Sequence, residues 1–211
     1  MKYNIHTHNS THQENVLEIV NQYPNEYDDS VKYFSIGIHP WYIDLDRVDE
    51  YLQIIDEKLQ LKNCLALGEC GLDKRIETSL EIQTAVFEKQ LHIAVKHQKP
   101  VILHCVSAYQ EVIEIKKRLN IDVPMIIHGF SKNYQVAKSL LDNGFYLSFG
   151  KYLLRNPELS TVFEQVPNNR FFLETDTIEE SIIDVYIKAA AIKQIDVEQI
   201  ISDNFKLVFN P

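Results

Sequence analysis

The sequence has few cysteines, and they are not arranged for disulfide or zinc–thiolate chemistry. Its 211 residues include only Cys64, Cys70 and Cys105, and no two of them form a CxxC pair. An odd number without paired spacing argues against a disulfide framework and against a thiolate metal site. We therefore expect three reduced thiols.

Long hydrophobic runs are absent as well. The longest of them, such as residues 123–127, extend over only a few positions, whereas a membrane-spanning helix needs ~20 apolar residues. The segment from Met1 to His6 turns polar almost at once, which argues against a secretory signal. We expect no membrane segment and a cytoplasmic protein.

Positive charge is scarce relative to negative charge. Lysine and arginine together number 21 against 30 aspartates and glutamates, which gives a formal net charge of −9. Non-specific binding to a nucleic-acid duplex depends on a basic surface that releases phosphate counterions. The charge balance argues against such binding and against a stable nucleic-acid complex, so a nucleic-acid substrate would have to be held locally.

What the chain does contain is an alternation of short β-rich runs with longer segments of helical period. Because 45% of the residues are hydrophobic, it can bury one substantial core, and we expect a single domain over residues 1–211. Helical stripes recur over residues 48–59 and 80–95. The alternation predicts an α/β fold, either a (β/α) barrel that is short for its class with a poorly marked, degenerate eighth strand or an open doubly wound sheet. The seven candidate strands are Tyr3 to His6, Tyr33 to Gly37, Cys64 to Gly68, Pro100 to His104, Pro124 to His128, Gly144 to Phe149 and Phe171 to Glu174.

Four of the eight histidines lie at or just after the carboxyl ends of predicted strands, namely His6, His8, His104 and His128. In parallel α/β folds this edge forms the active-site face, so side chains distant in sequence converge there. His6 and His8 are two residues apart on an extended segment. Both imidazoles therefore point to the same side and can chelate one ion.

Two carboxylates occupy equivalent places. Glu69 follows the third predicted strand, and Asp176 follows the seventh. Taken singly, such a carboxylate or histidine is more often a cap, an ion-pair partner or a hydrogen-bonded core residue. Because all six residues follow strands in order, and because imidazole and carboxylate are ligands for zinc, manganese and similar ions, we interpret them as a metal site.

Other polar residues near the strand ends are more ambiguous. His39 follows the second predicted strand and either contacts substrate or only shapes the turn before Pro40. Glu174 precedes Asp176 by two residues, and it is as readily a hydrogen-bond acceptor for a metal ligand as a group in the cavity. The histidines outside this pattern are His12, His92 and His97.

Seven motifs follow one another along the chain and carry a resemblance to a known family. They are His6-Thr7-His8, Gly37-Ile38-His39-Pro40, Gly68-Glu69-Cys70-Gly71-Leu72-Asp73, Pro100-Val101-Ile102-Leu103-His104-Cys105, His128-Gly129-Phe130-Ser131, Leu173-Glu174-Thr175-Asp176 and Asn204-Phe205 with Phe209. With these motifs the sequence resembles, from Tyr3 to Phe209, the TatD family of metal-dependent hydrolases, a branch of the amidohydrolase-like barrels that includes deoxyribonucleases.

The resemblance implies a TIM-type (β/α) barrel, which favours the barrel over the open sheet, and it implies one or two divalent ions. Asp176 is then the expected catalytic residue, as proton acceptor or as the group that orients a water. Histidine and carboxylate ligands admit zinc, manganese, iron or magnesium. The ligand set that the resemblance implies is His6, His8 and Asp176 for one ion, His104 and His128 for the other, and Glu69 as a bridge.

The sequence also departs from the family pattern. Asn4 stands where members usually have an aspartate, and Val106 stands where they tend to have an arginine that would suit a phosphate. Lys132 replaces a glycine of the family motif, and together with His39 it is a candidate for substrate binding. After Asp176 the usual proline-containing loop is missing, and we expect the chain to enter a helix directly.

These residues leave three functions open. The first is phosphodiester hydrolysis by a metal-activated water, acting on single-stranded DNA or DNA ends, since two divalent ions would outweigh the ligand carboxylates and make the pocket electropositive. The second is hydrolysis of a small ester, lactone or amide, which the net charge and Val106 favour. The third is a catalytically weak metal-binding scaffold, and the complete ligand set counts against it. The sequence gives no indication of oligomeric state.

Overall fold

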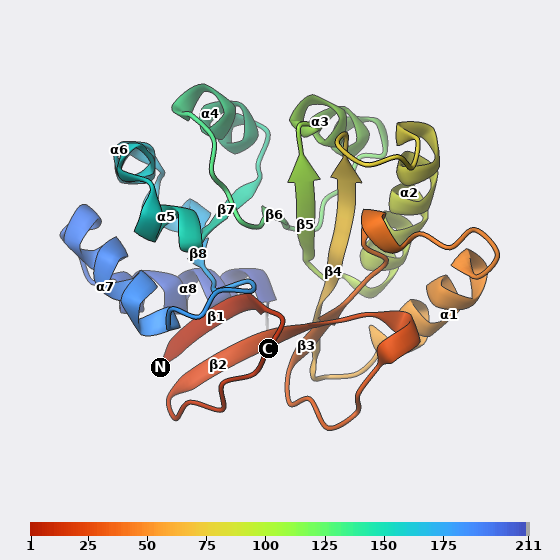
Figure 1. The fold of residues 1–211 in the computed structure, drawn as a ribbon, viewed down its shortest axis with the longest axis horizontal. Helices are drawn as coiled ribbons and strands as arrows, with labels where there is room; N and C mark the ends of the chain where they lie inside the picture. The colour runs from red at the N-terminus through yellow and green to blue at the C-terminus, as the bar shows by residue number, and fades with distance from the viewer. Residues whose placement is uncertain (210–211) are drawn as a thin grey trace. The chain divides into compact units, whose positions relative to one another are not determined.

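The computed structural model describes residues 1–209 of the chain (Figure 1). Its strands form an eight-stranded sheet in sequence order, and the paired strands run parallel. Parallel strands in sequence order with intervening helices define the TIM-type (β/α) fold class, as the resemblance implied. The strands are β1 (Lys2–Thr7), β2 (Val16–Gln22), β3 (Phe34–Ile36), β4 (Cys64–Asp73), β5 (Val101–Val106), β6 (Met125–Ile127), β7 (Tyr146–Phe149) and β8 (Phe171–Leu173).

The helices follow mainly the later strands. Within residues 1–209 the first α-helix begins at Val48, so the connections from β1 to β2 and from β2 to β3 hold no α-helix. These short connections help to explain a chain shorter than the ~250 residues typical of the class. No helix in the described part of the chain is both long enough and apolar enough to span a membrane. The helices are α1 (Val48–Lys58), α2 (Leu80–His97), α3 (Tyr109–Arg118), α4 (Tyr134–Asp142), α5 (Lys151–Arg155), α6 (Pro157–Gln165), α7 (Ile182–Lys193) and α8 (Val197–Phe209), with 3-10 turns η1 (Pro24–Glu26), η2 (Pro40–Tyr42) and η3 (Asn168–Arg170).

The chain separates into two compact units. The first unit comprises Met1–Val20 and Ile126–Pro211, and the second comprises Asn21–Met125. The divisions fall inside β2 and β6. The expectation of a single domain over residues 1–211 stays a prediction.

The first unit has an aromatic core between its strands and helices. The ring of Tyr3 on β1 stacks on Phe205 of α8 at 4.1 Å, and Phe205 stacks on Phe209 at 4.6 Å. On α6, Phe163 contacts Phe149 of β7 at 4.8 Å and the first residue of β8 at the same distance. Burial of each such ring stabilises the fold by about 1.5–3 kcal/mol.

In the second unit, α2 packs on β4 and carries two glutamines on its buried face. Gln90 accepts the N–H of Ile38 at 2.7 Å and donates to its carbonyl at 3.2 Å. Gln83 accepts the N–H of Asp73 at 2.8 Å and donates to its carbonyl at 2.9 Å. The helix thereby fixes the main chain beside His39 and at the end of β4.

The eighth strand, which the sequence marked poorly, is β2. Three polar side chains of this strand are buried, namely Glu18, Asn21 and Gln22. Glu18 accepts the N–H of Thr11 at 2.8 Å, and Gln22 accepts the N–H of Asp28 at 2.7 Å. These side chains interrupt the apolar pattern of the strand, which explains why hydrophobic periodicity did not reveal it. The seven predicted strands are all present, and β4 extends beyond its predicted end at Gly68.

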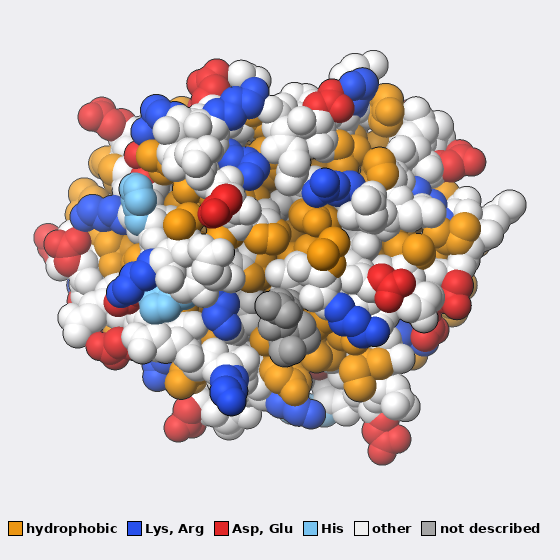
Figure 2. Space-filling model, turned by 180° about the vertical axis from the view of Figure 1, so that it is seen from behind, with side chains coloured by type: hydrophobic (Ala, Val, Ile, Leu, Met, Phe, Trp, Pro, Cys, Tyr) orange, Lys and Arg blue, Asp and Glu red, His pale blue; other side chains and the backbone are white. Residues whose placement is uncertain are grey.

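Charges of both signs are interspersed with apolar side chains on the molecular face shown in Figure 2. Lysines and arginines on this face stand among aspartates and glutamates rather than in one continuous basic area. This face therefore shows no continuous basic area of the kind that non-specific duplex binding needs.

Candidate metal centre

Three predicted ligands come together at the end of β1 in the first unit. Nε2 of His8 lies 3.5 Å from Oδ1 of Asp176, and Nε2 of His6 lies 3.8 Å from the same oxygen. The His6 side chain is fully buried, whereas those of His8 and Asp176 are partly exposed. The cluster thus has a buried side and a side that solvent reaches.

Main-chain hydrogen bonds fix Asp176 against β1. Its N–H donates to the carbonyl of His6 at 3.0 Å, and the N–H of His8 donates to the carbonyl of Asp176 at 3.1 Å. Asp176 has a φ of 57°, in the left-handed region where aspartate is enriched among non-glycine residues. Its position is therefore set by the strand that carries the two histidines.

Asn4 secures the residue before Asp176. Its Nδ2 donates to Oγ1 of Thr175 at 2.9 Å, and its Oδ1 accepts the N–H of Thr175 at 3.1 Å. Both side chains are buried. Asparagine thus keeps the carbonyl oxygen that an aspartate would offer to the Thr175 N–H, and it uses its amide as a second bond.

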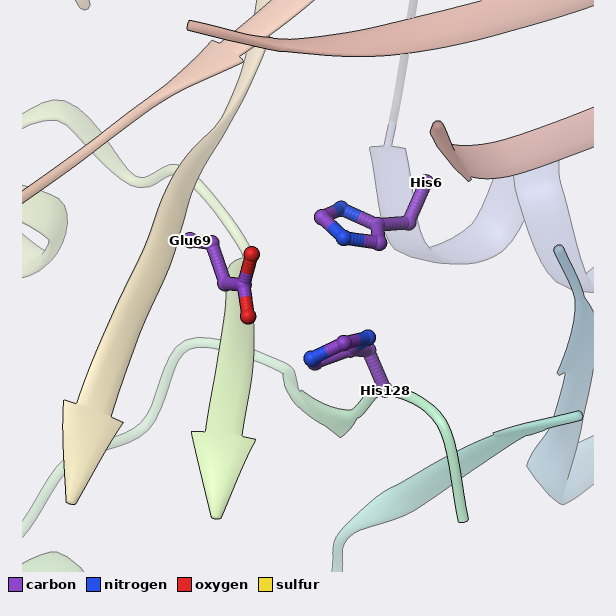
Figure 3. A group of neighbouring side chains, drawn as sticks. All are labelled: His6, Glu69 and His128. Carbon is purple, nitrogen blue, oxygen red and sulfur yellow. The ribbon is translucent and has the colours of Figure 1, made fainter. Parts of the chain in front are cut away.

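His128 follows β6 and faces Glu174. Nδ1 of His128 lies 3.3 Å from Oε1 of Glu174, and this oxygen also accepts the N–H of Gly129 at 2.8 Å. The rings of His6 and His128 lie 4.4 Å apart, and Figure 3 shows the two rings one above the other, extending in the same direction. A carboxylate on the second nitrogen is the usual partner of a ligating histidine, which supports the interpretation of Glu174 as an acceptor.

In the second unit, two carboxylates of β4 face His104 on β5. Nδ1 of His104 lies 2.9 Å from Oε1 of Glu69, and its Nε2 lies 3.2 Å from Oδ2 of Asp73. Glu69 and Asp73 are four residues apart on one strand, so both side chains point to the same side. Figure 3 shows Glu69 extending from β4.

Asp73 is held in its ionised form. Burial by itself would raise the pKa of this carboxyl, but hydrogen bonds from the Trp41 indole, the Arg75 N–H and His104 outweigh it and lower the pKa. A negative Asp73 orients the His104 ring through Nε2. Nδ1 then faces Glu69, as a ligand beside a carboxylate would.

His39 belongs to the same group. Its Nδ1 accepts the N–H of Trp41 at 3.1 Å, and its Nε2 lies 3.2 Å from Oε1 of Glu69. The His39 and His104 rings lie 4.3 Å apart. The structure therefore places His39 beside two predicted ligands rather than only in a turn.

Asn21 and two glycines determine the path of β4 around Glu69. Oδ1 of Asn21 accepts the N–H of Glu69 at 2.6 Å. Gly68 and Gly71 have φ of 138° and 142°, and a Cβ on Gly71 would come within 2.0 Å of the His104 carbonyl oxygen. These glycines thus allow β5 to approach β4 closely.

The donor sets fit a divalent ion. A tetrahedral ion with bonds of ~2.0–2.1 Å places its ligand atoms roughly 3.3 Å apart, close to the 3.5 and 3.8 Å between Asp176 and the two histidines. Candidate ligand atoms of His39, Glu69 and His104 likewise lie within 4.8 Å of one another. Histidine nitrogen with carboxylate oxygen is a combination that suits zinc, manganese or iron.

The structure adds residues that the sequence analysis assigned no role. Nζ of Lys151, in the first turn of α5, lies 3.4 Å from Oδ2 of Asp176 and is partly buried. Asp73 and Asn21 were also missed, although a period of two from Glu69 along β4 would have indicated Asp73. Lys132, a predicted substrate contact, lies half-buried in the loop before α4.

One expectation about the end of the site is wrong. The chain does not enter a helix directly after Asp176, because residues 177–181 form a short loop and α7 begins at Ile182. Oγ of Ser181 accepts the N–H of Asp184 and caps this helix, and the Asp184 carboxylate accepts the N–H of Ser181. This capping box sets the start of the helix at Ile182, after the loop.

The chain belongs to the family described as TatD related DNase, whose model matches residues 2–210. The uncharacterized metal-dependent hydrolase YabD of Bacillus subtilis is 35% identical over 156 residues, which cover 72% of this chain and 60% of YabD. The uncharacterized metal-dependent hydrolase YcfH of Escherichia coli is 30% identical over 198 residues, which cover 84% of this chain and 73% of YcfH. Several curated relatives are matched over about 60% of their own length.

Comparison with solved structures supports the fold. The crystal structure of YjjV, a TatD homologue from Escherichia coli, superposes with a TM-score of 0.77 and covers 92% of this chain and 86% of that one. The sequences are 21% identical. This likeness confirms the barrel fold class and leaves the substrate to be argued from the site.

Proposed function

We propose that this chain is a metal-dependent hydrolase that acts on phosphodiester bonds, with single-stranded DNA or DNA ends as the substrate class. The observation that carries the proposal is the cluster of His6, His8 and Asp176, two imidazoles and a carboxylate held by backbone bonds at a strand end. The proposed ligands are His6, His8, Glu69, His104, His128 and Asp176, for one or two divalent ions. Their convergence in one pocket stays a prediction, which a metal-bound crystal structure tests.

Asp176 is the proposed catalytic residue. A divalent ion supplies Lewis acidity and makes a water easier to deprotonate near neutral pH. Oδ1 of Asp176 faces the two histidines, while Oδ2 faces Lys151. This carboxylate is therefore placed to orient a water and to accept its proton, and Lys151 limits the negative charge there.

Cationic side chains near the cluster of His6, His8 and Asp176 favour an anionic substrate. The ammonium of Lys151 lies beside Asp176, and a phosphate oxygen there would gain a charge-assisted hydrogen bond. We assign Lys132 and His39 to substrate binding as well. The description of the family as TatD related DNase supports DNA as the source of that phosphate.

Hydrolysis of a small ester, lactone or amide is the second candidate. Val106 ends β5 beside Asp73 in the strand register, where a family arginine would have supplied a guanidinium. An apolar residue at this place suits an uncharged substrate better than a phosphodiester. A metal-binding scaffold without turnover is the third candidate. The placement of the Asp176 carboxylate beside His6 and His8 counts against it.

Elemental analysis of the purified protein, combined with substrate digests, tests the proposal. We expect about one or two equivalents of a divalent ion, degradation of single-stranded DNA faster than blunt duplex, loss of activity with a chelator and recovery on adding metal. A metal-replete sample that leaves DNA intact but cleaves a lactone or simple ester would transfer the function to the second candidate. A protein that holds metal but cleaves neither DNA nor a small ester would be the metal-binding scaffold of the third candidate.

A further inference from the structure

Trp41 is an exposed aromatic ring held rigidly at the edge of the His39–Glu69–His104 group. Trp41 is 56% exposed, although tryptophan is a large apolar residue that usually lies mostly buried. It lies in η2, directly after His39 and Pro40. Tyr42, the next residue, is 53% exposed.

Two hydrogen bonds keep the Trp41 ring in place. The indole Nε1–H donates to Oδ2 of Asp73 at 2.8 Å, and the main-chain N–H donates to Nδ1 of His39 at 3.1 Å. Asp73 is only 2% exposed, so the Nε1 edge of the indole is directed into the protein while much of the remaining ring meets solvent. A ring fixed in this way has already lost the side-chain freedom that binding would otherwise cost.

The same ring lies against candidate metal ligands. Its centroid is 5.1 Å from that of His39 and 5.7 Å from that of His104, with interplanar angles of 87° and 76°. Asp73 bonds both the Trp41 indole and Nε2 of His104 through one oxygen. A group stacked on the exposed part of Trp41 would therefore lie next to the His39–Glu69–His104 group.

We propose that Trp41 is a stacking surface for a nucleobase of a single-stranded substrate bound at the His39–Glu69–His104 group. The inference deepens the proposed function and rests on it for the identity of the substrate. Base stacking on an aromatic side chain tolerates every base, because each has a planar π-face. Stacking on Trp41 would hold a single strand through its bases rather than through its phosphates. Such binding suits an acidic protein that lacks the family arginine.

A purely structural role for Trp41 makes a different prediction. If the ring only covered Asp73 and His104, its loss would weaken the binding of any substrate equally. If it stacks on a base, its loss weakens only substrates that carry one. The chain contains one tryptophan, so intrinsic tryptophan fluorescence reports on this residue alone.

The first measurement is fluorescence titration of the metal-replete protein. A thymidine pentamer with phosphorothioate linkages, which resists cleavage, is compared with an abasic pentamer of the same length and linkage. We expect saturable quenching by the thymidine pentamer and roughly five- to hundredfold weaker binding of the abasic one. Equal affinity for the two pentamers, or binding of the thymidine pentamer without a change in emission, overturns the inference.

The second measurement compares variants by anisotropy of labelled pentamers. Trp41→Leu should weaken binding of the thymidine pentamer roughly five- to hundredfold and leave the abasic pentamer unchanged. Trp41→Phe, which keeps a ring but loses the bond to Asp73, should retain most of the affinity for thymidine. Leu61→Ala, at another exposed apolar residue, is the matched control and should bind both pentamers as wild type does. A Trp41→Leu variant that binds both pentamers like wild type, or loses both equally, contradicts stacking.

Failure of the inference and failure of the proposed function give different results. Cleavage of phosphodiesters with the same KM whether or not they carry a base would keep the proposed function and overturn the role of Trp41. Base-dependent quenching by a protein that cleaves no phosphodiester would support the stacking surface and overturn the proposed hydrolysis.

Discussion

Asn21 on β2 accepts the main-chain N–H of Glu69 on β4 through Oδ1 at 2.6 Å. The bond is buried, and it joins a residue without catalytic chemistry of its own to a candidate metal ligand. Its effect is to position the Glu69 backbone, and through it the carboxylate that faces His39 and His104.

Replacing Asn21 with alanine should therefore weaken both the fold and the site. The Asn21→Ala change leaves a buried N–H without its acceptor, which costs about 1–3 kcal/mol. We expect a lower melting temperature and a weaker affinity for divalent metal, measured by thermal unfolding and metal titration. Asn25→Ala, at an exposed position of the following turn, is the control. Wild-type metal affinity in Asn21→Ala would show that Glu69 does not depend on this bond.

Asp176→Asn tests the proposed proton acceptor. The substitution keeps the shape of the side chain and a carbonyl oxygen but removes the charge that faces His6 and His8. Turnover should fall by roughly two to four orders of magnitude, the usual worth of general-base assistance, while circular dichroism stays unchanged. Steady-state kinetics at saturating metal provide the measurement. Unchanged turnover would rule out the assigned role.

Substitution of Lys151 tests whether this residue binds an anionic substrate. A charge-assisted hydrogen bond is worth about 1.5–3 kcal/mol, so Lys151→Met should raise KM for a phosphodiester by roughly ten- to hundredfold. Lys151→Arg should keep most of the affinity, since the cation beside Asp176 remains. KM for a neutral lactone should not rise in either variant. An equal rise for both substrates would mean that Lys151 acts on Asp176 rather than on the phosphate.

The three thiols should be unreactive until the chain unfolds. Burial raises the pKa of Cys64 and of Cys105 to about 12, and that of Cys70 well above its usual range. A thiol of the unfolded chain ionises near ~8.5, so above that pH the unfolded chain releases protons that the folded chain keeps. Stability from these groups is therefore present below ~8.5 and is lost as the pH rises further. Labelling with a thiol reagent at pH 8 should be slow in buffer and reach three groups in denaturant. Rapid labelling of the folded protein would contradict this prediction.

The sequence predicted the parts of the fold that depend on apolar pattern. Strands such as 101–106 and 171–173 are rich in apolar residues, and helices such as α1 and α2 show a clear stripe. The apolar pattern did not predict β2, because Glu18, Asn21 and Gln22 of this strand are polar yet buried. Their burial depends on bonds to residues elsewhere in the chain, which no local pattern displays.

The candidate site was predictable where residue type and position at a strand end coincide. His6, His8 and Asp176 lie together in the structure, and so do Glu69 and His104. Lys151 could not be recognised, since a lysine at the start of a short helix is ordinary on a surface. Lys151 stands out only in the structure, where its ammonium lies beside the carboxylate of Asp176, which is 25 positions further along the chain.

The backbone bonds between β1 and Asp176 also have a consequence for protein synthesis. His6 and His8 are translated about 170 residues before Asp176, which forms backbone bonds to their segment. At about 5–20 residues per second on the ribosome, Asp176 is synthesised on the order of ten seconds or longer after the two histidines. A nascent chain cannot assemble this cluster before Asp176 has emerged, so an ion held by all three residues could bind only after that point.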